Sequence, residues 1–185
     1  MNITVYMASS FGNDQEIKKG AEELGRWIAE NGNTLVYGGS ESGLMGVTAD
    51  AALKRNGRVI GVEPQFFIDM GYEHHGITEL IITNDIPERR KKMLELGDAF
   101  IALPGGTGTL EEISEIMSNT ALGFIKAPCI FFNINHFYDF LKQQIEHMVE
   151  TGLFSEKGYR LINFCDSIEE IDKCIKSFKE QENVI

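Results

Sequence analysis

The chain has 185 residues, enough for one sizeable hydrophobic core and too few for a second core to be expected, so we expect a single domain over residues 1–185. Its net charge of −11, with no basic stripe, argues against DNA or RNA as a partner, although backbone N–H groups can still bind a small phosphate ester. Because there is no basic leader and no run of about 18 apolar residues that would predict a membrane span, we expect a soluble, cytoplasmic protein.

Short apolar strands alternate with helices in the first third of the chain. The first helix carries an apolar stripe with the spacing of an α-helix and is closed by Gly32-Asn33. The expected elements are a strand over Ile3–Ala8, a helix over Asp14–Glu30, a strand over Leu35–Tyr37, a helix over Leu44–Arg55 and a strand over Arg58–Val62.

The same alternation continues after an irregular segment expected over Pro64–Gly76. Asp85 is expected to cap the next helix, with Glu88 completing a capping box and Pro87 tolerated in the first turn. The other expected elements are strands over Ile77–Thr83, Ala99–Leu103, Pro128–Phe132 and Leu161–Phe164, and helices over Thr109–Gly123, His136–Val149 and Ser167–Lys179. This order predicts an α/β fold, a single Rossmann-like, doubly wound, mostly parallel sheet with helices on both faces. Ligands of such sheets bind beyond the carboxyl ends of the strands.

Two glycine-rich turns fall at that edge, GGSESGLMG over Gly38–Gly46 and PGGTGT over Pro104–Thr109. Each follows a strand and precedes a helix, where glycine lets backbone approach a phosphate and the helix N-terminus supplies N–H donors. A single turn of this kind is equally well explained by a sharp corner that needs positive φ, so the prediction rests on the pair. No Gly-Lys-Ser/Thr ends either turn, and Glu111 stands where a dinucleotide motif needs its third glycine. ATP or GTP hydrolysis and a nicotinamide cofactor are therefore not expected.

The helix after the second turn has two adjacent carboxylates, Glu111 and Glu112, near its start. Acidic residues favour a first helical turn in any case, but successive residues point about 100° apart, so the two cannot share a role. Thr109 and Glu112 face the same way, and Glu111 is expected to face solvent. The expected core stripe of this helix is Leu110, Ile113 and Met117. If Thr109 contacts a phosphate, Glu112 is directed at the attached sugar, where a carboxylate can stabilise an oxocarbenium-like transition state.

A second candidate is Arg89 in the segment ERRKKM, although a solvated basic helix face explains such a run equally well. The segments ERRKKM and PGGTGTLEE, with VYGGSESGLMG and VIGVEP upstream, resemble the LOG family, the cytokinin riboside 5′-monophosphate phosphoribohydrolases, which were often labelled lysine decarboxylases. The resemblance extends from Ser9 to about Phe154, and the signature PGGxGTxxE is intact. The chain departs from the usual family pattern at Ser40, Pro87, Arg90 and Glu63. Glu63 falls at a strand end near the expected pocket, so these changes bear on the preferred base.

The resemblance implies a homodimer that hydrolyses the N-glycosidic bond of purine nucleoside 5′-monophosphates, N6-substituted cytokinin-type ones included. The products are the free base and ribose 5-phosphate, and the resemblance implies no metal or organic cofactor. It also implies that Arg89 and Glu112 are the catalytic residues. The expected substrate-binding residues are Gly39, Gly43, Gly46, Arg90, Gly105, Gly106, Thr107, Gly108 and Thr109.

Three alternatives compete with this hypothesis. A non-catalytic nucleotide or phosphate-ligand carrier on the same fold, as in the related molybdenum-cofactor carrier proteins, needs the glycine turns but not the pair Arg89 and Glu112. A lysine decarboxylase needs pyridoxal phosphate on a Schiff-base lysine, and no lysine stands in a recognisable context for that. A metal site is not expected, because the four histidines lack HxxxH or HxxE spacing.

Overall fold

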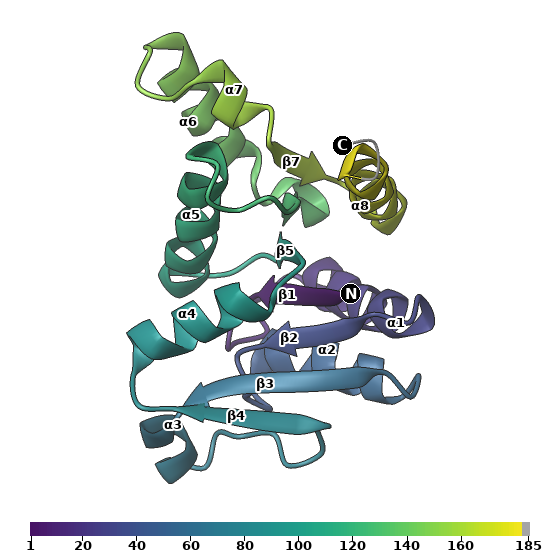
Figure 1. Cartoon of the computed structure of the whole chain (residues 1–185). Coiled ribbons are helices and arrows are strands. Elements are labelled where there is room, and N and C mark those ends of the chain that lie inside the picture. The colour runs from purple at the N-terminus through teal and green to yellow at the C-terminus, as the bar shows by residue number, and fades with distance from the viewer. Residues whose placement is uncertain (183–185) are drawn as a thin grey trace.

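A computed structural model describes residues 1–182. Its centre is a seven-stranded sheet in the order β4-β3-β2-β1-β5-β6-β7, and all six strand pairs are parallel (Figure 1). The strands are β1 Asn2–Tyr6, β2 Thr34–Tyr37, β3 Arg58–Pro64, β4 Glu79–Thr83, β5 Ala99–Ala102, β6 Cys129–Phe132 and β7 Ile162–Cys165. The predicted α/β fold with a parallel sheet is therefore confirmed.

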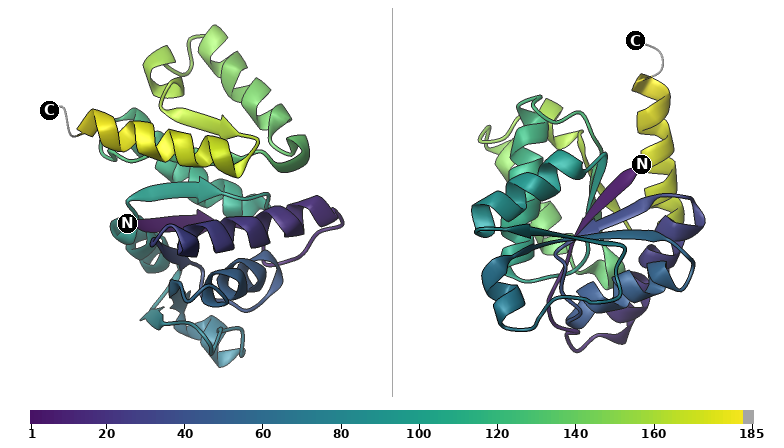
Figure 2. Two further views of the ribbon diagram at one scale, coloured as in Figure 1. Left: turned by 90° about the vertical axis from the view of Figure 1, so that its right-hand side faces the viewer. Right: turned by 60° about the horizontal axis from the view of Figure 1, so that its bottom comes forward.

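Helices cover both faces of this sheet, as the three ribbon views show (Figures 1 and 2). The helices are α1 Gln15–Glu30, α2 Gly43–Leu53, α3 Gln65–Asp69, α4 Ile86–Leu96, α5 Thr107–Ala121, the 3-10 helix η1 Ile134–His136, α6 Asp139–Glu150, α7 Glu156–Tyr159 and α8 Ile168–Glu182. Helices α1, α2 and α8 pack on one face, and α4, α5 and α6 pack on the other. No helix within residues 1–182 is long and apolar enough to cross a membrane.

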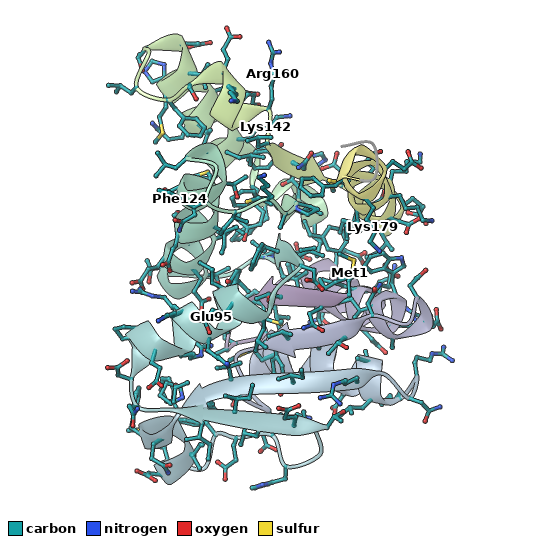
Figure 3. The ribbon with its side chains drawn as sticks, in the orientation of Figure 1. Met1, Glu95, Phe124, Lys142, Arg160 and Lys179 are labelled. Atoms are coloured by element: carbon teal, nitrogen blue, oxygen red, sulfur yellow. The ribbon has the colours of Figure 1, made fainter. Side chains whose placement is uncertain are left out.

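The central strands contribute to two hydrophobic cores because successive side chains point to opposite faces. In β5, Ala99 and Ile101 join the core under α1, α2 and α8, whereas Phe100 and Ala102 join the core under α4, α5 and α6. Both faces of these central strands are buried, which explains why their sequences are continuous apolar runs rather than alternating ones. The surface keeps some large apolar side chains, among them Phe124 just after α5, which is 79% exposed (Figure 3).

The strand order reverses direction between β1 and β5, which lie side by side with Tyr6 opposite Ala102. The chain moves outward from β1 through β2, β3 and β4, and then returns to the other side of β1. The loops after β1 and β5 consequently leave the sheet in opposite directions. A crevice at the carboxyl ends of these strands is where a sheet of this kind binds its ligand.

The segment expected to be irregular over Pro64–Gly76 is more ordered than its sequence indicates. Gln65–Asp69 form helix α3, and the residues after it pair with the loop that follows β2. The Glu41 N–H donates to the Tyr72 carbonyl at 3.1 Å, and the His74 N–H donates to the Gly39 carbonyl at 2.9 Å. The expectation failed because this short segment is held by contacts with a loop distant in the sequence.

The helix expected over His136–Val149 is interrupted. Asn135 and His136 have φ of 47° and 61°, so η1 ends at His136 and α6 begins at Asp139. Left-handed backbone does not continue an α-helix. Helix α7 was not predicted; it is a single turn capped by the Ser155 hydroxyl, which accepts from the Gly158 N–H at 3.0 Å.

Three details of α4 and α5 also differ from expectation. The Asp85 cap is confirmed, since its carboxylate accepts from the Glu88 N–H at 2.8 Å, but Glu88 accepts from the Asn84 N–H rather than from Asp85. Helix α5 begins at Thr107, two residues before the predicted start. Leu110, expected in the core stripe of α5, is 36% exposed, and Ile116 is buried instead.

Candidate active site

Two adjoining cavities occupy the carboxyl edge of the sheet near the reversal of strand order. The larger, here named the Glu112 cavity, has a volume of about 570 Å³ and is lined by the loop after β1 and the starts of α4 and α5. The smaller, the Glu63 cavity, has a volume of about 340 Å³ and lies over the ends of β2 and β3. Their shared lining residues are Ser9, Met45, Phe67 and Arg89. One elongated ligand can therefore occupy both cavities.

Arg89 stands between the two cavities and is fixed at three points. Its Nε donates to the Val62 carbonyl at 3.0 Å, and its Nη1 donates to Glu112 Oε1 at 3.1 Å. Its Nη2 lies against Gly38, where an added Cβ would stand only 2.3 Å from that nitrogen. The glycine at position 38 thus gives the guanidinium room to reach the end of β2. The Asp85 cap, one turn earlier in α4, sets the direction of the helix that carries it.

Glu112 points from the second turn of α5 toward Arg89. Its side chain is 11% exposed and that of Arg89 is 15% exposed, so the ion pair is largely shielded from water. Burial raises the pKa of the Glu112 carboxyl above its usual range, and the positive charge of Arg89 counteracts part of this effect. The pair can hold a charged carboxylate at the wall of a partly dry cavity, where it acts strongly on a positive charge that develops nearby.

The second glycine turn forms the start of α5. Gly106 is the N-cap, and Thr107, Gly108 and Thr109 form the first turn, where backbone N–H groups have no intrahelical partner. These residues line the Glu112 cavity, so their donors are available to an anion there. Gly105 has a packing role, since a Cβ on it would stand 2.1 Å from Thr109 Oγ1. The hydroxyl of Thr109 therefore packs against Gly105 of the turn, and Thr109 is only 4% exposed.

Arg90, expected to bind substrate, lines the Glu112 cavity but is paired with carboxylates of α5. Its Nη1 contacts Glu111 Oε1, and its Nε lies 3.6 Å from Glu115 Oε2. The Glu111 side chain is 61% exposed, in line with the expectation that it faces solvent. These ion pairs tie α4 to α5 at the rim of the cavity, beside the buried pair of Arg89 and Glu112.

The glycines of the first turn are explained by close packing. A Cβ on Gly43 would lie 2.3 Å from the Ser9 carbonyl carbon, and a Cβ on Gly46 would lie 2.0 Å from the Glu41 carbonyl oxygen. Gly39 has φ of +87° and lies directly over Glu63. None of these three glycines lines either cavity, and their predicted contact with substrate stays a prediction. The neighbouring Ser40 and Ser42 do line the Glu63 cavity.

The structure adds residues that the motifs did not single out. Phe67 on α3 and Tyr72 after it line the Glu63 cavity, and Met45 on α2 lines both cavities. Phe67 and Tyr72 come from the segment read as irregular, whose aromatic residues were the only signal in the sequence. Glu63, noted in the sequence for its place at a strand end, is buried with 2% exposure and lines the same cavity.

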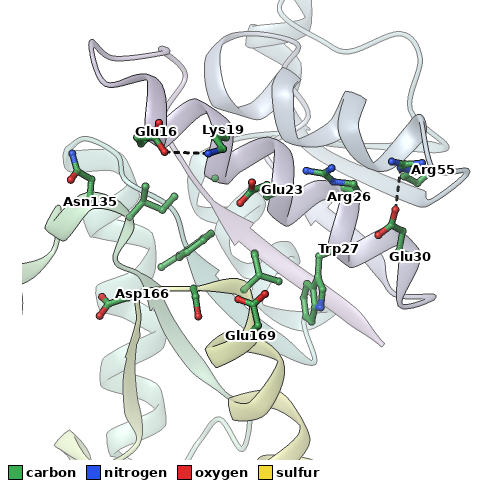
Figure 4. Close-up of a pocket in the computed structure, with 15 residues that line it drawn as sticks. Glu16, Lys19, Glu23, Arg26, Trp27, Glu30, Arg55, Asn135, Asp166 and Glu169 are labelled. Carbon is green, nitrogen blue, oxygen red and sulfur yellow. Dashed lines mark ion pairs between the residues drawn. The ribbon is translucent and has the colours of Figure 1, made fainter.

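A third cavity of about 700 Å³ lies between α1, the loop after β6 and the start of α8 (Figure 4). Neither glycine turn contributes to it. Two ion pairs, Glu16 with Lys19 and Glu30 with Arg55, are among the side chains that line it. None of the predicted site residues lines it. Within residues 1–182 no group of three or more His, Cys, Asp or Glu side chains is placed to hold a metal ion.

The chain is similar to known proteins in both sequence and structure. The model of a protein family described as "Possible lysine decarboxylase" matches residues 45–175. A cytokinin riboside 5′-monophosphate phosphoribohydrolase from Rhodococcoides fascians is 40% identical over 95% of this chain and 89% of its own length. One from Oryza sativa subsp. japonica is 37% identical over 86% of this chain and 66% of its own length. Among solved structures, the molybdenum cofactor binding protein from Rippkaea orientalis superposes with a TM-score of 0.73 at 25% identity, over 95% of both chains.

Proposed function

The chain belongs to the LOG family of cytokinin riboside 5′-monophosphate phosphoribohydrolases, whose family description is "Possible lysine decarboxylase", and from this membership we propose its reaction. The protein is an N-glycosyl hydrolase that cleaves purine nucleoside 5′-monophosphates, N6-substituted ones included, to the free base and ribose 5-phosphate. The reaction consumes one water molecule and needs no metal or organic cofactor.

The phosphate of the substrate is held at the start of α5. The N–H groups of Thr107, Gly108 and Thr109 point out of the first turn, and the helix dipole adds partial positive charge there. Arg90 lies at the rim of the same cavity, where its guanidinium is already paired with the carboxylates of Glu111 and Glu115 and contributes less than a full positive charge. A net charge of −11 does not oppose this contact, because short-range backbone donors bind the dianion locally.

The sugar lies one helical turn farther along α5, against Glu112. As the bond to the base breaks, positive charge develops on the ribose ring, and the carboxylate of Glu112 stabilises it and positions the attacking water. Arg89 holds Glu112 by the 3.1 Å hydrogen bond and lies where both cavities meet, so it also orients the nucleotide between sugar and base. The base extends into the Glu63 cavity.

A single observation carries this proposal, the buried ion pair of Arg89 and Glu112 beside the glycine turn. A protein that only binds a phosphate ester needs the turn, but it has no use for a shielded carboxylate one turn beyond it. Burying a charged pair is costly, so its presence at the junction of two cavities is best explained by catalysis.

The alternative is a non-catalytic carrier, and it is favoured by the structural similarity to the molybdenum cofactor binding protein of Rippkaea orientalis. Purified protein mixed with AMP, N6-isopentenyl-AMP, IMP, CMP and UMP decides between the two. We expect chromatography to detect free adenine and ribose 5-phosphate from AMP. Binding of the nucleotides without release of base from any of them would favour the carrier.

Lysine decarboxylation does not fit the site. A pyridoxal phosphate enzyme needs a lysine for the Schiff base, and no lysine within the described residues lines the Glu112 cavity or the Glu63 cavity. We therefore expect protein purified with added pyridoxal phosphate to show no Schiff-base absorbance and to release no carbon dioxide from lysine.

We also propose that the protein is a cytoplasmic homodimer. Large apolar side chains are exposed on or next to α5 and α6, namely Leu122, Phe124, Phe137, Phe140 and Leu153, and a second copy of the chain would cover such side chains. Light scattering after size exclusion should give twice the 20.7 kDa of one chain, and a monomer at working concentration would contradict the proposal.

A further inference from the structure

Glu63 is a buried carboxyl group that the proposed mechanism does not use. It stands at the end of β3, on the face covered by α2, and is 2% exposed. Its Oε2 atom is buried and has no hydrogen-bond partner among residues 1–182. An unsatisfied buried carboxyl oxygen is costly, above all when the group is ionised, so this position favours the neutral acid. Glu63 also lines the Glu63 cavity, so a ligand bound there lies beside its side chain.

The neighbours of Glu63 leave it without a dedicated partner. The guanidinium of Arg89 lines the same cavity but is bonded to the Val62 carbonyl and to Glu112. Glu73, on the segment that pairs with the loop after β2, adds a like charge. On the adjacent strand, the Tyr37 hydroxyl is buried and has no partner either. A loop glycine, Gly39, covers Glu63 so closely that a Cβ there would stand 3.1 Å from Oε2.

This environment favours the uncharged acid. Burial raises the pKa of Glu63 to about 7, Arg89 lowers it in part, and Glu73 raises it further. Near neutral pH a large share of the molecules therefore carries Glu63 as a carboxylic acid, which has one O–H donor and remaining acceptor capacity. A carboxylate, by contrast, can only accept.

The cavity around Glu63 has a lining that suits an aromatic ring. Met45, Phe67 and Tyr72 contribute apolar surface, while Ser40, Ser42, Glu63 and Arg89 contribute polar atoms. Because Arg89 also lines the Glu112 cavity, a nucleotide with its sugar at Glu112 directs its base into this space. Apolar walls with a few placed polar groups are what a ligand pocket needs for orientation and selectivity.

We propose that Glu63 binds the base as a carboxylic acid, donating a hydrogen bond from its O–H to an unprotonated ring nitrogen of a purine. This assignment rests on the proposed function, because it places the base of a nucleotide beyond the sugar held by Glu112. It makes Glu63 a residue that determines specificity. Purine rings carry such acceptors at N1, N3 and N7, and loss of the correct one leaves the acid unsatisfied again.

Binding, measured by calorimetry in a Glu112→Gln background that slows turnover, tests the proposal. The ligands are AMP and its 1-deaza, 3-deaza and 7-deaza analogues, each of which replaces one ring nitrogen by C–H. We expect one analogue to bind about tenfold more weakly than AMP. In Glu112→Gln/Glu63→Leu the same analogue and AMP should bind equally well, whereas Glu63→Gln, which keeps a donor and an acceptor, should retain the discrimination.

The protonation of Glu63 gives a second test, which is the pH dependence of nucleotide binding. Above pH 7 the free site is mostly ionised, so binding of AMP must take up a proton, and the preference for AMP over the sensitive analogue should shrink as pH rises to 8.5. The phosphate titrates equally in both ligands, so their ratio isolates Glu63 from it. In the Glu63→Gln variant the ratio should not change with pH.

The outcomes separate this inference from the proposed function. If AMP binds but no deaza analogue differs between Glu63 and its leucine variant, the inference is wrong and the proposed function stands. Discrimination without proton uptake also overturns it, because an ionised Glu63 cannot donate. If AMP binds to no variant, the proposed function itself is wrong and the inference falls with it.

Discussion

Two buried acids, Glu63 and Glu112, lie on opposite sides of Arg89 and have different environments. Glu112 is bonded to the guanidinium at 3.1 Å, whereas Oε2 of Glu63 has no partner. Burial raises the pKa of both acids, and for Glu63 it reaches about 7. Groups held in different protonation states by their surroundings can take different roles in one site. We infer that the charged acid faces the sugar and that the neutral acid faces the base.

Replacement of Glu112 by glutamine tests its role. The amide keeps the size of the side chain but removes the negative charge that stabilises the transition state, so kcat for AMP should fall by about a hundredfold or more, about 3 kcal/mol of barrier. Affinity for AMP should stay within a few-fold of the wild type. Steady-state kinetics with calorimetry measures both, and Glu95→Gln, on the exposed side of α4, provides the matched control. Near-normal turnover of Glu112→Gln would remove Glu112 from the mechanism.

Glu63 should make the stability of the protein depend on pH. Its pKa rises from 4.5 to about 7 on folding, so the folded state binds the proton more tightly and loses stability as pH rises through this window. Glutamine cannot ionise and avoids that loss. Urea unfolding should therefore show that Glu63→Gln gains more stability at pH 8.5 than at pH 5.5, by about 2 kcal/mol. An equal effect at both pH values would mean that Glu63 is not titrating.

The first turn of helix α5 has a structural role and a proposed role in binding. Gly106 caps the helix without a side-chain hydrogen bond, so the N–H groups behind it stay available to a ligand. In α4, by contrast, the Asp85 carboxylate already accepts from the Glu88 N–H. We propose that the donors left available at the start of α5 bind the phosphate.

Two alanine substitutions at the glycine turn should have opposite effects on stability. A Cβ at Gly105 would collide with Thr109, so Gly105→Ala should destabilise the fold by about 1–3 kcal/mol. A Cβ at Gly108 meets nothing within 4 Å, and alanine favours a helix, so Gly108→Ala should stabilise by about 0.5–1 kcal/mol. Thermal unfolding measures both changes.

The Gly108→Ala variant also tests where the phosphate of the substrate binds. If it lies against the first turn of α5, the methyl group of Gly108→Ala should raise KM for AMP although the protein is more stable. Unchanged KM in this variant would place the phosphate away from Gly108. Because stability and affinity move in opposite directions, a loss of affinity in Gly108→Ala cannot be attributed to unfolding.

The whole molecule presents its site at one edge of the sheet, where loops from β1, β2, β3 and β5 meet. We propose that a substrate is held at both ends, with its phosphate at α5 and its base near β3, and that the reacting bond lies between them. Binding energy from the remote phosphate can then be used to orient the reacting carbon. The enzyme should accordingly depend strongly on a group that takes no part in the chemistry.

Comparison of AMP with adenosine tests this dependence. We expect kcat/KM for adenosine to be lower by about a hundredfold or more, about 3 kcal/mol, because adenosine lacks the group bound by the turn. Addition of inorganic phosphate or phosphite to reactions with adenosine should restore part of the rate if the missing contact is responsible. Similar kcat/KM for the two substrates would contradict the proposed place of the phosphate.

Local patterns in the sequence were sufficient for most elements. Apolar runs predicted every strand to within a few residues, and Asp85 with Pro87 predicted the start of α4, because capping and periodicity act within a few residues of chain. The predictions failed where contacts between residues distant in the sequence determine the local structure. The residues after α3 are held by the loop after β2, and the left-handed backbone at Asn135 and His136 breaks an otherwise helical pattern.

The sequence by itself determined the α/β fold, the two glycine turns and the direction of Glu112, since these follow from periodicity and helix geometry. Only the tertiary structure decided that Arg89 lies within hydrogen-bond distance of Glu112, because the two residues are 23 positions apart on different helices. It likewise decided that Glu63 is buried without a partner, although the sequence put it at a strand end. Burial and pairing depend on which elements the sheet brings together, and no local pattern encodes that.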